Sequence, residues 1–307
     1  MKVIVSEFMD ASALDGFGSQ FDVTYEPNLV DNRDKLLSLL TDADAVIVRN
    51  RTQVDQEMLD RAPKLRAVGR LGVGLDNIDM AACAARDVSV HPAVGANAEA
   101  VAEYVITSAL VLGRGAFFAN SRMIAGEWPR GALMGSEVGG LTLGLYGFGN
   151  IARVTAQKAR ALGMTVLATD PHLDAADPAW EGIENVARDD LLIRSDVLSL
   201  HLPLTDETRG LLNAEALGQM KPSAILVNTA RGGIVDESAL ATALKNGALR
   251  GAALDVFEDE PLTTAAAEKF RDVPNLILTP HIAGVTEQAN VRVSHVTVRN
   301  VREALLS

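Results

Sequence analysis

The sequence predicts an α/β protein made of two doubly wound parallel-sheet domains, one inserted into the other. Short apolar strands alternate with helical patterns over residues 1–98 and again over 141–282, which is typical of parallel sheets covered by helices. The chain has 307 residues, whereas a single core usually stops growing at roughly 250–300 residues. A glycine-rich turn between a strand and a helix, a unit that opens many simpler chains, stands about 140 residues into this one.

The first domain draws on residues 1–98. Its strands are expected at 3–5, 23–25, 45–48, 65–68 and 88–90, with helical patterns between them such as 33–40 and 56–61. This pattern fits a small flavodoxin-like layer. An apolar buried helix is expected next, over 101–112, followed by a second helix over 117–126.

The second domain repeats the alternation with six expected strands, which fit a doubly wound sheet. They lie at residues 141–146, 165–168, 197–200, 224–228, 251–254 and 276–278. A last helix over 286–306 is expected to return to the first domain, because the second sheet is complete without it. The predicted domains are therefore residues 1–98 with 284–307, and residues 99–283.

The turn after strand 141–146 reads G-x-G-x-x-A and runs into a helix. Gly147 allows a tight turn, Gly149 lets the backbone approach a pyrophosphate, and Ala152 lets helix and strand pack closely. The N–H groups at the start of that helix favour phosphate. The alternative interpretation is a glycine turn that only packs helix on strand. The predicted phosphate-binding residues are Gly147, Gly149, Asn150 and Ile151.

An acid ends the next predicted strand. Asp170 stands 21 residues after Gly149, where a carboxylate accepts hydrogen bonds from the adenosine ribose and repels a 2′-phosphate. With this context the sequence predicts NAD as the cofactor of a Rossmann domain. A second glycine turn, over 72–74, also follows a strand, but the residues after it match the fingerprint poorly.

Composition and charge limit the classes of molecule that this protein can be expected to bind. The chain is 48% hydrophobic and 22% charged, and its net charge is −12, which argues against nucleic acids and anionic membranes as partners. No signal peptide is visible, and the apolar window 101–112 is too short to span a bilayer. The single cysteine, Cys83, suits a reducing cytoplasm. We expect a cytoplasmic protein that acts on a small molecule and holds no metal.

Carbonyl reduction with a nicotinamide cofactor also needs a proton donor, and histidine suits this task near neutral pH. His281 follows strand 276–278, where the carboxyl end of a parallel strand meets the ligand crevice. His201 also ends a strand and is the rival donor. Position favours His281 but leaves both open among the five histidines, which are His91, His172, His201, His281 and His295.

Several segments together resemble the D-isomer-specific 2-hydroxyacid dehydrogenase family, in order and over essentially the whole chain. They are Val68 to Asp79, His201 to Thr205, Val227 to Gly233, Ala253 to Pro261 and Leu278 to Gly284. The resemblance implies an NAD domain inserted between two pieces of a substrate domain. The fingerprint of that family usually ends in glycine where this chain has Ala152, and alanine is an accepted variant.

The resemblance also implies a catalytic set. Arg231 corresponds to a clamp whose guanidinium grips a 2-keto acid through a planar fork. His281 corresponds to the proton donor, and Glu260 to the carboxylate that orients the imidazole and favours its charged form. The competing interpretations are a helix-capping arginine and a surface acid before Pro261.

Further residues take binding roles by the same resemblance. The implied cofactor contacts beyond the fingerprint and Asp170 are His201, Pro203, Thr208, Thr229, Ala230, Asp255, His281 and Gly284. Val73 and Gly74 correspond to a loop that holds the substrate carboxylate. The apolar helix 101–112 carries more hydrophobic surface than one domain needs, and family members commonly dimerise in this region, so we expect a homodimer.

Three arginines bear on the substrate. Arg49 and Arg51 follow strand 45–48, and Arg70 ends the next strand, so they suit a 2-hydroxy acid with a second anion such as a phosphate or sulfonate. Arg49 and Arg70 resemble the 3-phosphoglycerate dehydrogenase branch of the family, whereas residues 127–130 and 147–152 are more similar to sulfolactate dehydrogenases. The alternative is that the three arginines pair with Asp76 or Asp79. A hydroxypyruvate or glyoxylate reductase stays open, as do an NAD(H)-sensing corepressor-like protein and a nucleotide-binding module without turnover.

We predict that Asp170 favours NAD over NADP. The preference in kcat/KM should be about 10-fold or more, or about 1.4 kcal/mol, because the carboxylate would lie beside the 2′-phosphate. The three following residues, Pro171 to Leu173, include no arginine to neutralise that phosphate. Steady-state kinetics with the two reduced cofactors measures the ratio, and equal kcat/KM values would contradict the prediction.

Overall fold

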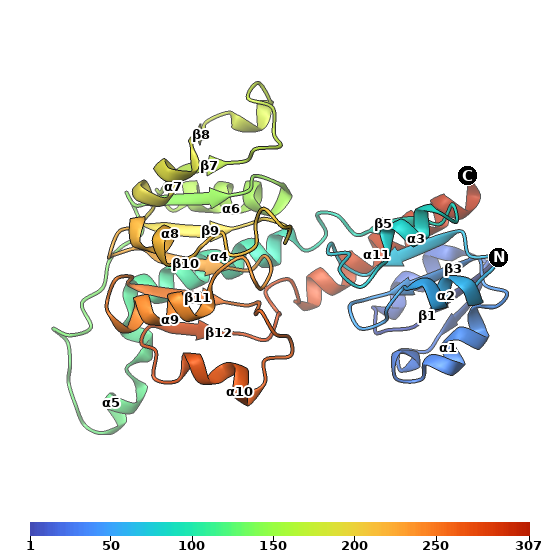
Figure 1. The fold of residues 1–307 in the computed structure, drawn as a ribbon, viewed down its shortest axis with the longest axis horizontal. Helices are drawn as coiled ribbons and strands as arrows, with labels where there is room; N and C mark the ends of the chain where they lie inside the picture. The colour runs from blue at the N-terminus through green and yellow to red at the C-terminus, as the bar shows by residue number, and fades with distance from the viewer. The chain divides into compact units, whose positions relative to one another are not determined.

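The computed structural model describes residues 1–307, and the chain folds into two compact units (Figure 1). Unit 1 comprises Met1–Asn97 and Val285–Ser307, and unit 2 comprises Ala98–Gly284. Each boundary lies one residue from the one expected. The last helix, α11 (Glu287–Leu306), belongs to unit 1, where it packs on β4 and β5 and on the 3-10 helix η1.

Unit 1 contains a five-stranded parallel sheet in the order β2-β1-β3-β4-β5, which is the flavodoxin-like order. Its strands are β1 (Lys2–Val5), β2 (Asp22–Tyr25), β3 (Ala45–Val48), β4 (Ala67–Arg70) and β5 (Ser89–Pro92). β4 begins two residues later than expected. Val48 of β3 pairs with Arg70 of β4, so Arg49 and Arg70 lie at the same edge of this sheet.

Helices cover both faces of the unit 1 sheet. α1 (Arg33–Leu40), α2 (Gln56–Arg61) and α3 (Met80–Ala84) bury their apolar residues on one face, and α11 with η1 (Ala11–Phe17) covers the other. Between β2 and α1 lies η2 (Leu29–Asp31). The close approach of α11 requires glycine at position 69, because a Cβ there would lie 2.5 Å from Val301.

Unit 2 contains a seven-stranded parallel sheet in the order β12-β11-β10-β9-β6-β7-β8. Its strands are β6 (Thr142–Tyr146), β7 (Thr165–Thr169), β8 (Glu184–Asn185), β9 (Val197–Leu200), β10 (Ile225–Asn228), β11 (Gly251–Leu254) and β12 (Leu276–Leu278). The order reverses between β6 and β9, as in doubly wound dinucleotide folds. The expectation of six strands was wrong, because β8 is two exposed polar residues without an apolar pattern.

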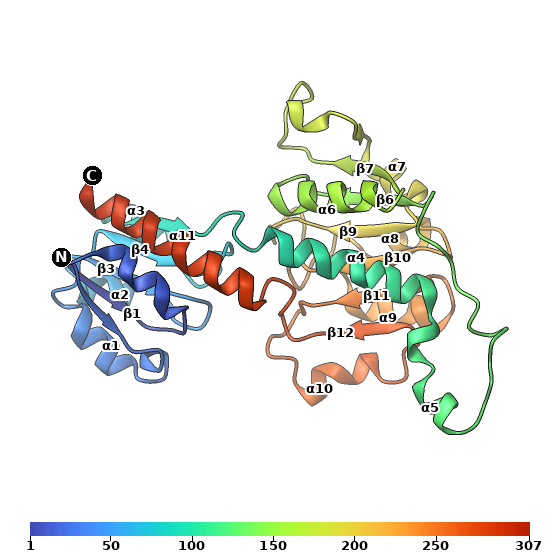
Figure 2. The ribbon, with the colours of Figure 1, turned by 180° about the vertical axis from the view of Figure 1, so that it is seen from behind.

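The helices of unit 2 form two layers. α4 (Ala98–Arg114) and α6 (Asn150–Ala161) lie together on one face (Figure 2). The other face carries α7 (Arg188–Arg194), α8 (Ala214–Gln219) and α9 (Glu237–Lys245). The shorter elements are η3 (Ala116–Phe118), α5 (Asn120–Ile124), η4 (Pro178–Trp180), α10 (Thr264–Ala267) and η5 (Glu268–Phe270). No helix in the chain combines the length and the apolar character needed to cross a bilayer.

Buried apolar residues of α4, such as Val105, Ala109 and Leu112, pack against α6 and β10 inside unit 2, while Leu110 and Val111 stay partly exposed. One expectation about the region after α4 was wrong. The helix expected over 117–126 is instead split into η3 and the short α5. The exposed apolar side chains lie after α4, on these two elements and the segment that follows them.

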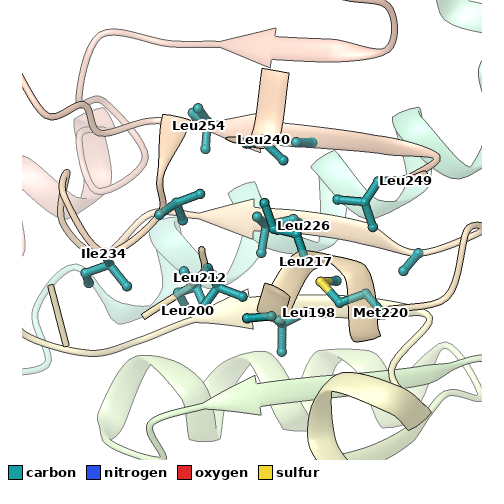
Figure 3. Packing of buried hydrophobic residues seen from close by; sticks show 14 of the residues in the cluster. Leu198, Leu200, Leu212, Leu217, Met220, Leu226, Ile234, Leu240, Leu249 and Leu254 are labelled. Carbon is teal, nitrogen blue, oxygen red and sulfur yellow. The ribbon is translucent and has the colours of Figure 1, made fainter. Parts of the chain in front are cut away.

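The core under α7, α8 and α9 is built from leucines of the central strands and of the helices. Figure 3 shows Leu198, Leu226 and Leu254 from β9, β10 and β11 facing Leu217 and Leu240. All five side chains are buried. Because this packing holds neighbouring strands in register, their carboxyl ends finish level with one another.

Candidate active site

The site lies at the carboxyl ends of the unit 2 strands. One row of paired residues crosses six strands and consists of Thr169, Tyr146, Leu200, Asn228, Leu254 and Leu278. Since the strands are parallel, the residues that follow this row share one edge of the sheet. They are Asp170, Gly147, His201, Thr229, Asp255 and Thr279, and all except Thr279 were predicted to bind the cofactor.

The two fingerprint glycines differ in their backbone conformation and in their surroundings. Gly147 has a φ of +88°, and a Cβ there would lie 2.5 Å from the His201 carbonyl oxygen, so the turn itself requires glycine. A Cβ at Gly149 would meet no atom within 4 Å, so this position faces open space. α6 begins directly afterwards without a side-chain cap, which leaves the N–H groups of its first turn for a phosphate.

Asp170 ties the end of β7 to the fingerprint turn. Its Oδ2 accepts the Phe148 N–H at 2.8 Å and its Oδ1 accepts the His172 N–H at 2.9 Å. Each carboxylate oxygen has a further lone pair with which to accept a ribose hydroxyl. At the same edge, the hydroxyl oxygen of Thr229 is buried without a hydrogen-bond partner. These features fit a nicotinamide dinucleotide.

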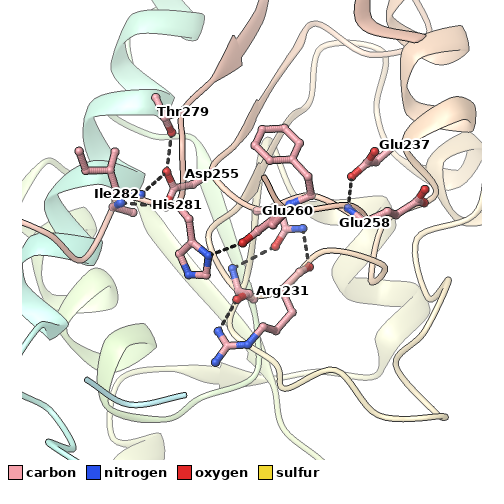
Figure 4. A network of polar contacts seen from close by, with 12 residues as sticks. Arg231, Glu237, Asp255, Glu258, Glu260, Thr279, His281 and Ile282 are labelled. Atoms are coloured by element: carbon pink, nitrogen blue, oxygen red, sulfur yellow. Dashed lines mark hydrogen bonds and ion pairs between the residues drawn. The ribbon is translucent and has the colours of Figure 1, made fainter. Parts of the chain in front are cut away.

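Glu260 and His281 form a close pair (Figure 4). Glu260 Oε2 lies 2.8 Å from His281 Nδ1, and Glu260 Oε1 accepts the Phe257 N–H at 2.9 Å. Burial raises the pKa of the Glu260 carboxyl, but its hydrogen bonds from His281 and Phe257, with the charges of His281 and Arg231, hold the pKa below its ordinary value. Because Nδ1 is engaged, Nε2 is the ring nitrogen that can donate to a substrate.

The backbone of His281 is held in an unusual conformation. Its φ is +53°, a left-handed value that a histidine adopts at some cost. Its N–H donates to the Asp255 carbonyl oxygen at 2.8 Å. The Asp255 carboxylate accepts the Thr279 hydroxyl at 2.6 Å and the Ile282 and Ala283 N–H groups at 2.8 Å.

Asp255 therefore has a clear structural task. The resemblance placed it beside the nicotinamide, but its side chain is only 1% exposed and its oxygens bind the loop that carries His281. The network extends to α4 through Tyr104, whose hydroxyl lies 2.6 Å from Thr279 Oγ1. Sequence reasoning missed both residues, because Tyr104 lies in no motif and Thr279, although inside the segment Leu278 to Gly284, was assigned no role there.

The turn that carries Arg231 is closed by Asn228, another residue that sequence reasoning missed. The Asn228 carboxamide accepts the Ala230 N–H at 3.0 Å and donates to the Arg231 carbonyl oxygen at 3.0 Å. Arg231 Nη1 donates to the Ala230 carbonyl oxygen at 2.6 Å. Arg231 lies near enough to Glu260 for its charge to lower the Glu260 pKa, so these two predicted catalytic residues belong to one site with His281.

His201, the rival proton donor, is not in its charged, proton-donating form at neutral pH in this structure. Burial lowers the pKa of His201 to about 4, so the ring is neutral at pH 7. Its Nε2 lies 3.0 Å from Ser199 Oγ on the same strand. The geometry therefore favours His281 as the donor.

The remaining predicted cofactor residues shape nearby loops. Thr208 Oγ1 donates to the Pro203 carbonyl oxygen at 2.7 Å, which closes the loop after β9. Ala230 is buried in the Arg231 turn, and Gly284 is the last residue of unit 2.

The three arginines of unit 1 differ in their surroundings. Arg49 is half-buried, and its Nη1 donates to the Phe8 carbonyl oxygen at 3.2 Å and to Asn290 Oδ1 at 2.9 Å. Burial lowers the pKa of the Arg49 guanidinium. Arg51 forms an exposed ion pair with Asp31. Neither of these arginines shows the alternative pairing with Asp76 or Asp79.

Arg70 folds over the loop that carries Val73 and Gly74. Its Nη1 donates to the Leu71 carbonyl oxygen at 2.9 Å, and a Cβ on Gly72 would lie 1.6 Å from that nitrogen. No helix follows this turn until α3 begins at Met80, so it lacks the second half of a dinucleotide fingerprint.

Glu7 is the residue of unit 1 that sequence reasoning missed. Its side chain is buried, and it accepts the N–H groups of Arg49, Arg51 and Thr52 at 2.8, 3.2 and 2.9 Å. A single acid after a strand looks like a surface charge in the sequence. In the fold it fixes the backbone of the Arg49 to Thr52 loop.

A Rossmann unit whose strand edge gathers a fingerprint turn, an arginine and a Glu–His pair defines a nicotinamide-dependent dehydrogenase. The chain belongs to the D-isomer specific 2-hydroxyacid dehydrogenase family, and the family model of the NAD binding domain matches residues 106–283. It is an NAD-dependent oxidoreductase that acts on CH–OH groups.

Individual relatives agree with this family. The chain is 55% identical over 304 residues to (S)-sulfolactate dehydrogenase of Chromohalobacter salexigens, covering 99% of this chain and 98% of that protein. It is 41% identical to D-3-phosphoglycerate dehydrogenase of Mycobacterium tuberculosis, covering 99% of this chain but 56% of that longer protein. The crystal structure of TT0316 protein from Thermus thermophilus has a TM-score of 0.88 and 34% identity, covering 100% of this chain and 97% of that one.

We predict that Glu260→Gln moves the alkaline limb of the pH profile of keto-acid reduction to lower pH. The paired carboxylate favours the charged imidazole, so without it the imidazole loses its proton at lower pH. Measuring kcat/KM from pH 6 to about 10 shows the shift. Glu268→Gln, which removes an exposed ion pair with Arg271, is the control and should leave the limb in place.

Removal of the proton donor itself should lower the rate of keto-acid reduction more than Glu260→Gln does. His281→Ala should lower kcat by about 10²–10⁴-fold. An unmoved pH profile in Glu260→Gln, together with loss of turnover in His201→Ala, would show that His201 is the donor.

Proposed function

We propose that this enzyme interconverts a 2-hydroxy acid bearing a second anionic group, of the sulfolactate type, and the corresponding 2-keto acid. The observation that carries the chemistry is the 2.8 Å contact between Glu260 and His281, with the charge of Arg231 close by. The 55% identity to a sulfolactate dehydrogenase, over nearly the full length of both chains, supports the substrate class.

Each member of the site has one task in reduction. His281 donates a proton from Nε2 to the carbonyl oxygen as negative charge develops there. Glu260 orients the ring through Nδ1 and stabilises its charged form. Arg231 grips the carboxylate of the keto acid and polarises its carbonyl group, since a guanidinium fork matches two oxygens at once. In the oxidative direction His281 accepts the proton instead.

The cofactor would be held along the strand edge. Gly149 and the first turn of α6 would take the pyrophosphate, Asp170 the adenosine ribose, and Thr229 the nicotinamide end. When bound, the nicotinamide supplies or accepts the hydride.

Arg49 is the best candidate to meet the second anion. Its side chain is half-buried, and Phe8 and Asn290 hold one guanidinium nitrogen, while Glu7 fixes the loop that carries it. Such a guanidinium is pre-oriented and partly desolvated, so it binds an anion more strongly than a mobile surface arginine does. Arg51 is engaged by Asp31 at the surface and is the weaker candidate.

We predict that reduction of sulfopyruvate or phosphohydroxypyruvate exceeds that of hydroxypyruvate or glyoxylate by about 10-fold or more in kcat/KM, or about 1.4 kcal/mol. NADH oxidation followed by absorbance measures all four substrates. Arg49→Gln should remove most of this preference, whereas Arg51→Gln should retain it. Higher kcat/KM for hydroxypyruvate or glyoxylate in the wild type would instead identify a reductase of those smaller acids.

We also propose that the protein is a cytoplasmic homodimer that pairs through the segment after α4. Four large side chains there are strongly exposed, namely Phe117 at 65%, Ile124 at 87%, Trp128 at 74% and Met134 at 85%. Figures 1 and 2 show α5 standing away from the sheet of its own unit. Several large apolar side chains exposed within one segment favour a protein interface there. The buried free thiol of Cys83 suits a reducing compartment.

Light scattering at micromolar concentration should give a dimeric mass for the wild type. Ile124→Glu places a charge in the proposed interface and should shift the protein to monomer. Ile193→Glu changes an apolar residue of α7 that is 53% exposed outside this segment, and it should remain dimeric. A monomeric wild type would contradict the proposal.

A further inference from the structure

Glu237 is a buried carboxylate that the proposed reaction does not use. It is the first residue of α9, and its side chain is 3% exposed. Its Oε1 accepts the Glu258 N–H at 2.7 Å, and its Oε2 pairs with Lys269 Nζ at 2.7 Å. Figure 4 shows the first of these contacts, beside the Glu260–His281 pair. A carboxylate buried this deeply needs such partners.

The peptide between Phe257 and Glu258 is held from two sides. Glu237 binds its N–H on one side. Gly232 packs against the other, since a Cβ at this position would lie 1.7 Å from the Phe257 carbonyl oxygen and 2.7 Å from the Glu258 nitrogen. Gly232 directly follows Arg231, so the turn that carries the arginine rests on the same peptide.

The neighbouring peptide group fixes Glu260. The Phe257 N–H donates to Glu260 Oε1 at 2.9 Å, which leaves Oε2 to contact His281 at 2.8 Å. A continuous series of contacts therefore leads from Glu237 through residues 257 and 258 to the catalytic pair. A displacement of this loop would change the position of Glu260 relative to both Arg231 and His281.

Lys269 keeps the Glu237 carboxylate neutralised. Its ammonium also lies 3.3 Å from Glu258 Oε2 and 5.7 Å from the centre of the Phe270 ring. Burial lowers the pKa of Lys269, but Glu237 and Glu258 raise it by more, so the net pKa is above the ordinary value. The lysine thus remains charged at neutral pH.

We propose that Glu237, supported by Lys269, is a positioning residue that sets Glu260 against Arg231 and His281. The inference rests on the proposed function, because it assigns Glu237 a part in the same reaction. A group that only stabilised the fold would change the unfolding temperature. A positioning group also changes kcat/KM and the pH profile while cofactor binding stays the same.

The experiment compares Glu237→Gln with Asp196→Asn in the full-length enzyme. Asp196 is a matched control, because it also accepts a backbone N–H, from Thr142 at 2.9 Å, and pairs with Lys221 at 2.8 Å. It precedes β9 and so lies at the opposite, amino edge of the sheet. Each variant loses one buried or half-buried ion pair of unit 2. Only the pair of Glu237 and Lys269 adjoins the catalytic site.

For Glu237→Gln we expect kcat/KM for the keto acid to fall by about 10- to 100-fold, as displaced catalytic groups commonly cause. The alkaline limb should also move to lower pH, because Glu260 no longer holds the imidazole. The Kd of NADH, from fluorescence titration, should change by less than about 2-fold, which is under 0.5 kcal/mol. Asp196→Asn should match the wild type in all three measurements.

Lys269→Met provides a second variant if Glu237→Gln does not fold, because it keeps an apolar stem over Phe270. It should show the same changes to a smaller degree. A folded Glu237→Gln or Lys269→Met with wild-type kcat/KM and pH profile would overturn the inference, as would equal losses in Asp196→Asn. A wild-type enzyme that reduces no 2-keto acid would instead overturn the proposed function.

Discussion

The register of the seven-stranded parallel sheet is the constraint on which the rest of the structure depends. The row of paired residues from Thr169 to Leu278 ends six strands at one level. Residues far apart in the sequence, such as Gly147 and Asp255, are therefore neighbours along one edge. A slip of one residue in any strand would turn the next side chain to the other face of the sheet. The leucine core beneath α7 to α9 opposes such a slip, because five of these strands, β6, β7, β9, β10 and β11, contribute buried side chains to it.

Carboxylates that bind backbone N–H groups then fix the loops on this edge. Asp170 holds the fingerprint turn, Asp255 holds the His281 loop, and Glu260 accepts an N–H of its own loop. Unit 1 contains the same arrangement, because the Glu7 carboxylate accepts a backbone N–H of the loop that carries Arg49. In a chain with a net charge of −12, these four acids are thus engaged by backbone N–H groups of the loops that they hold. Hydrogen bonds to charged groups are among the stronger ones in proteins, so these loops are well defined.

Much of this organisation could be predicted from the sequence. Short apolar strands that alternate with helices determine a parallel sheet, and the residues after strand ends must then share an edge, which is why Asp170 and His281 could be found. β8 escaped prediction because a two-residue polar strand has no periodicity. The pattern of α4 could not locate an interface, because an apolar helix inside an α/β layer has the same pattern as an apolar helix at an interface. Glu237 and Glu7 could not be recognised, since a buried acid differs from a surface acid only through partners that the fold supplies.

The most direct test of the account is a structure of the enzyme with NADH and oxamate, an isostere of a 2-keto acid. We predict that His281 Nε2 lies within about 2.6–3.2 Å of the oxamate oxygen that replaces the carbonyl oxygen. We also predict that Arg231 binds the oxamate carboxylate while Glu260 keeps its contact with Nδ1. An oxamate oxygen bound by His201 instead, or a Glu260 carboxylate separated from His281, would contradict the assignment of this edge of the sheet as the catalytic site.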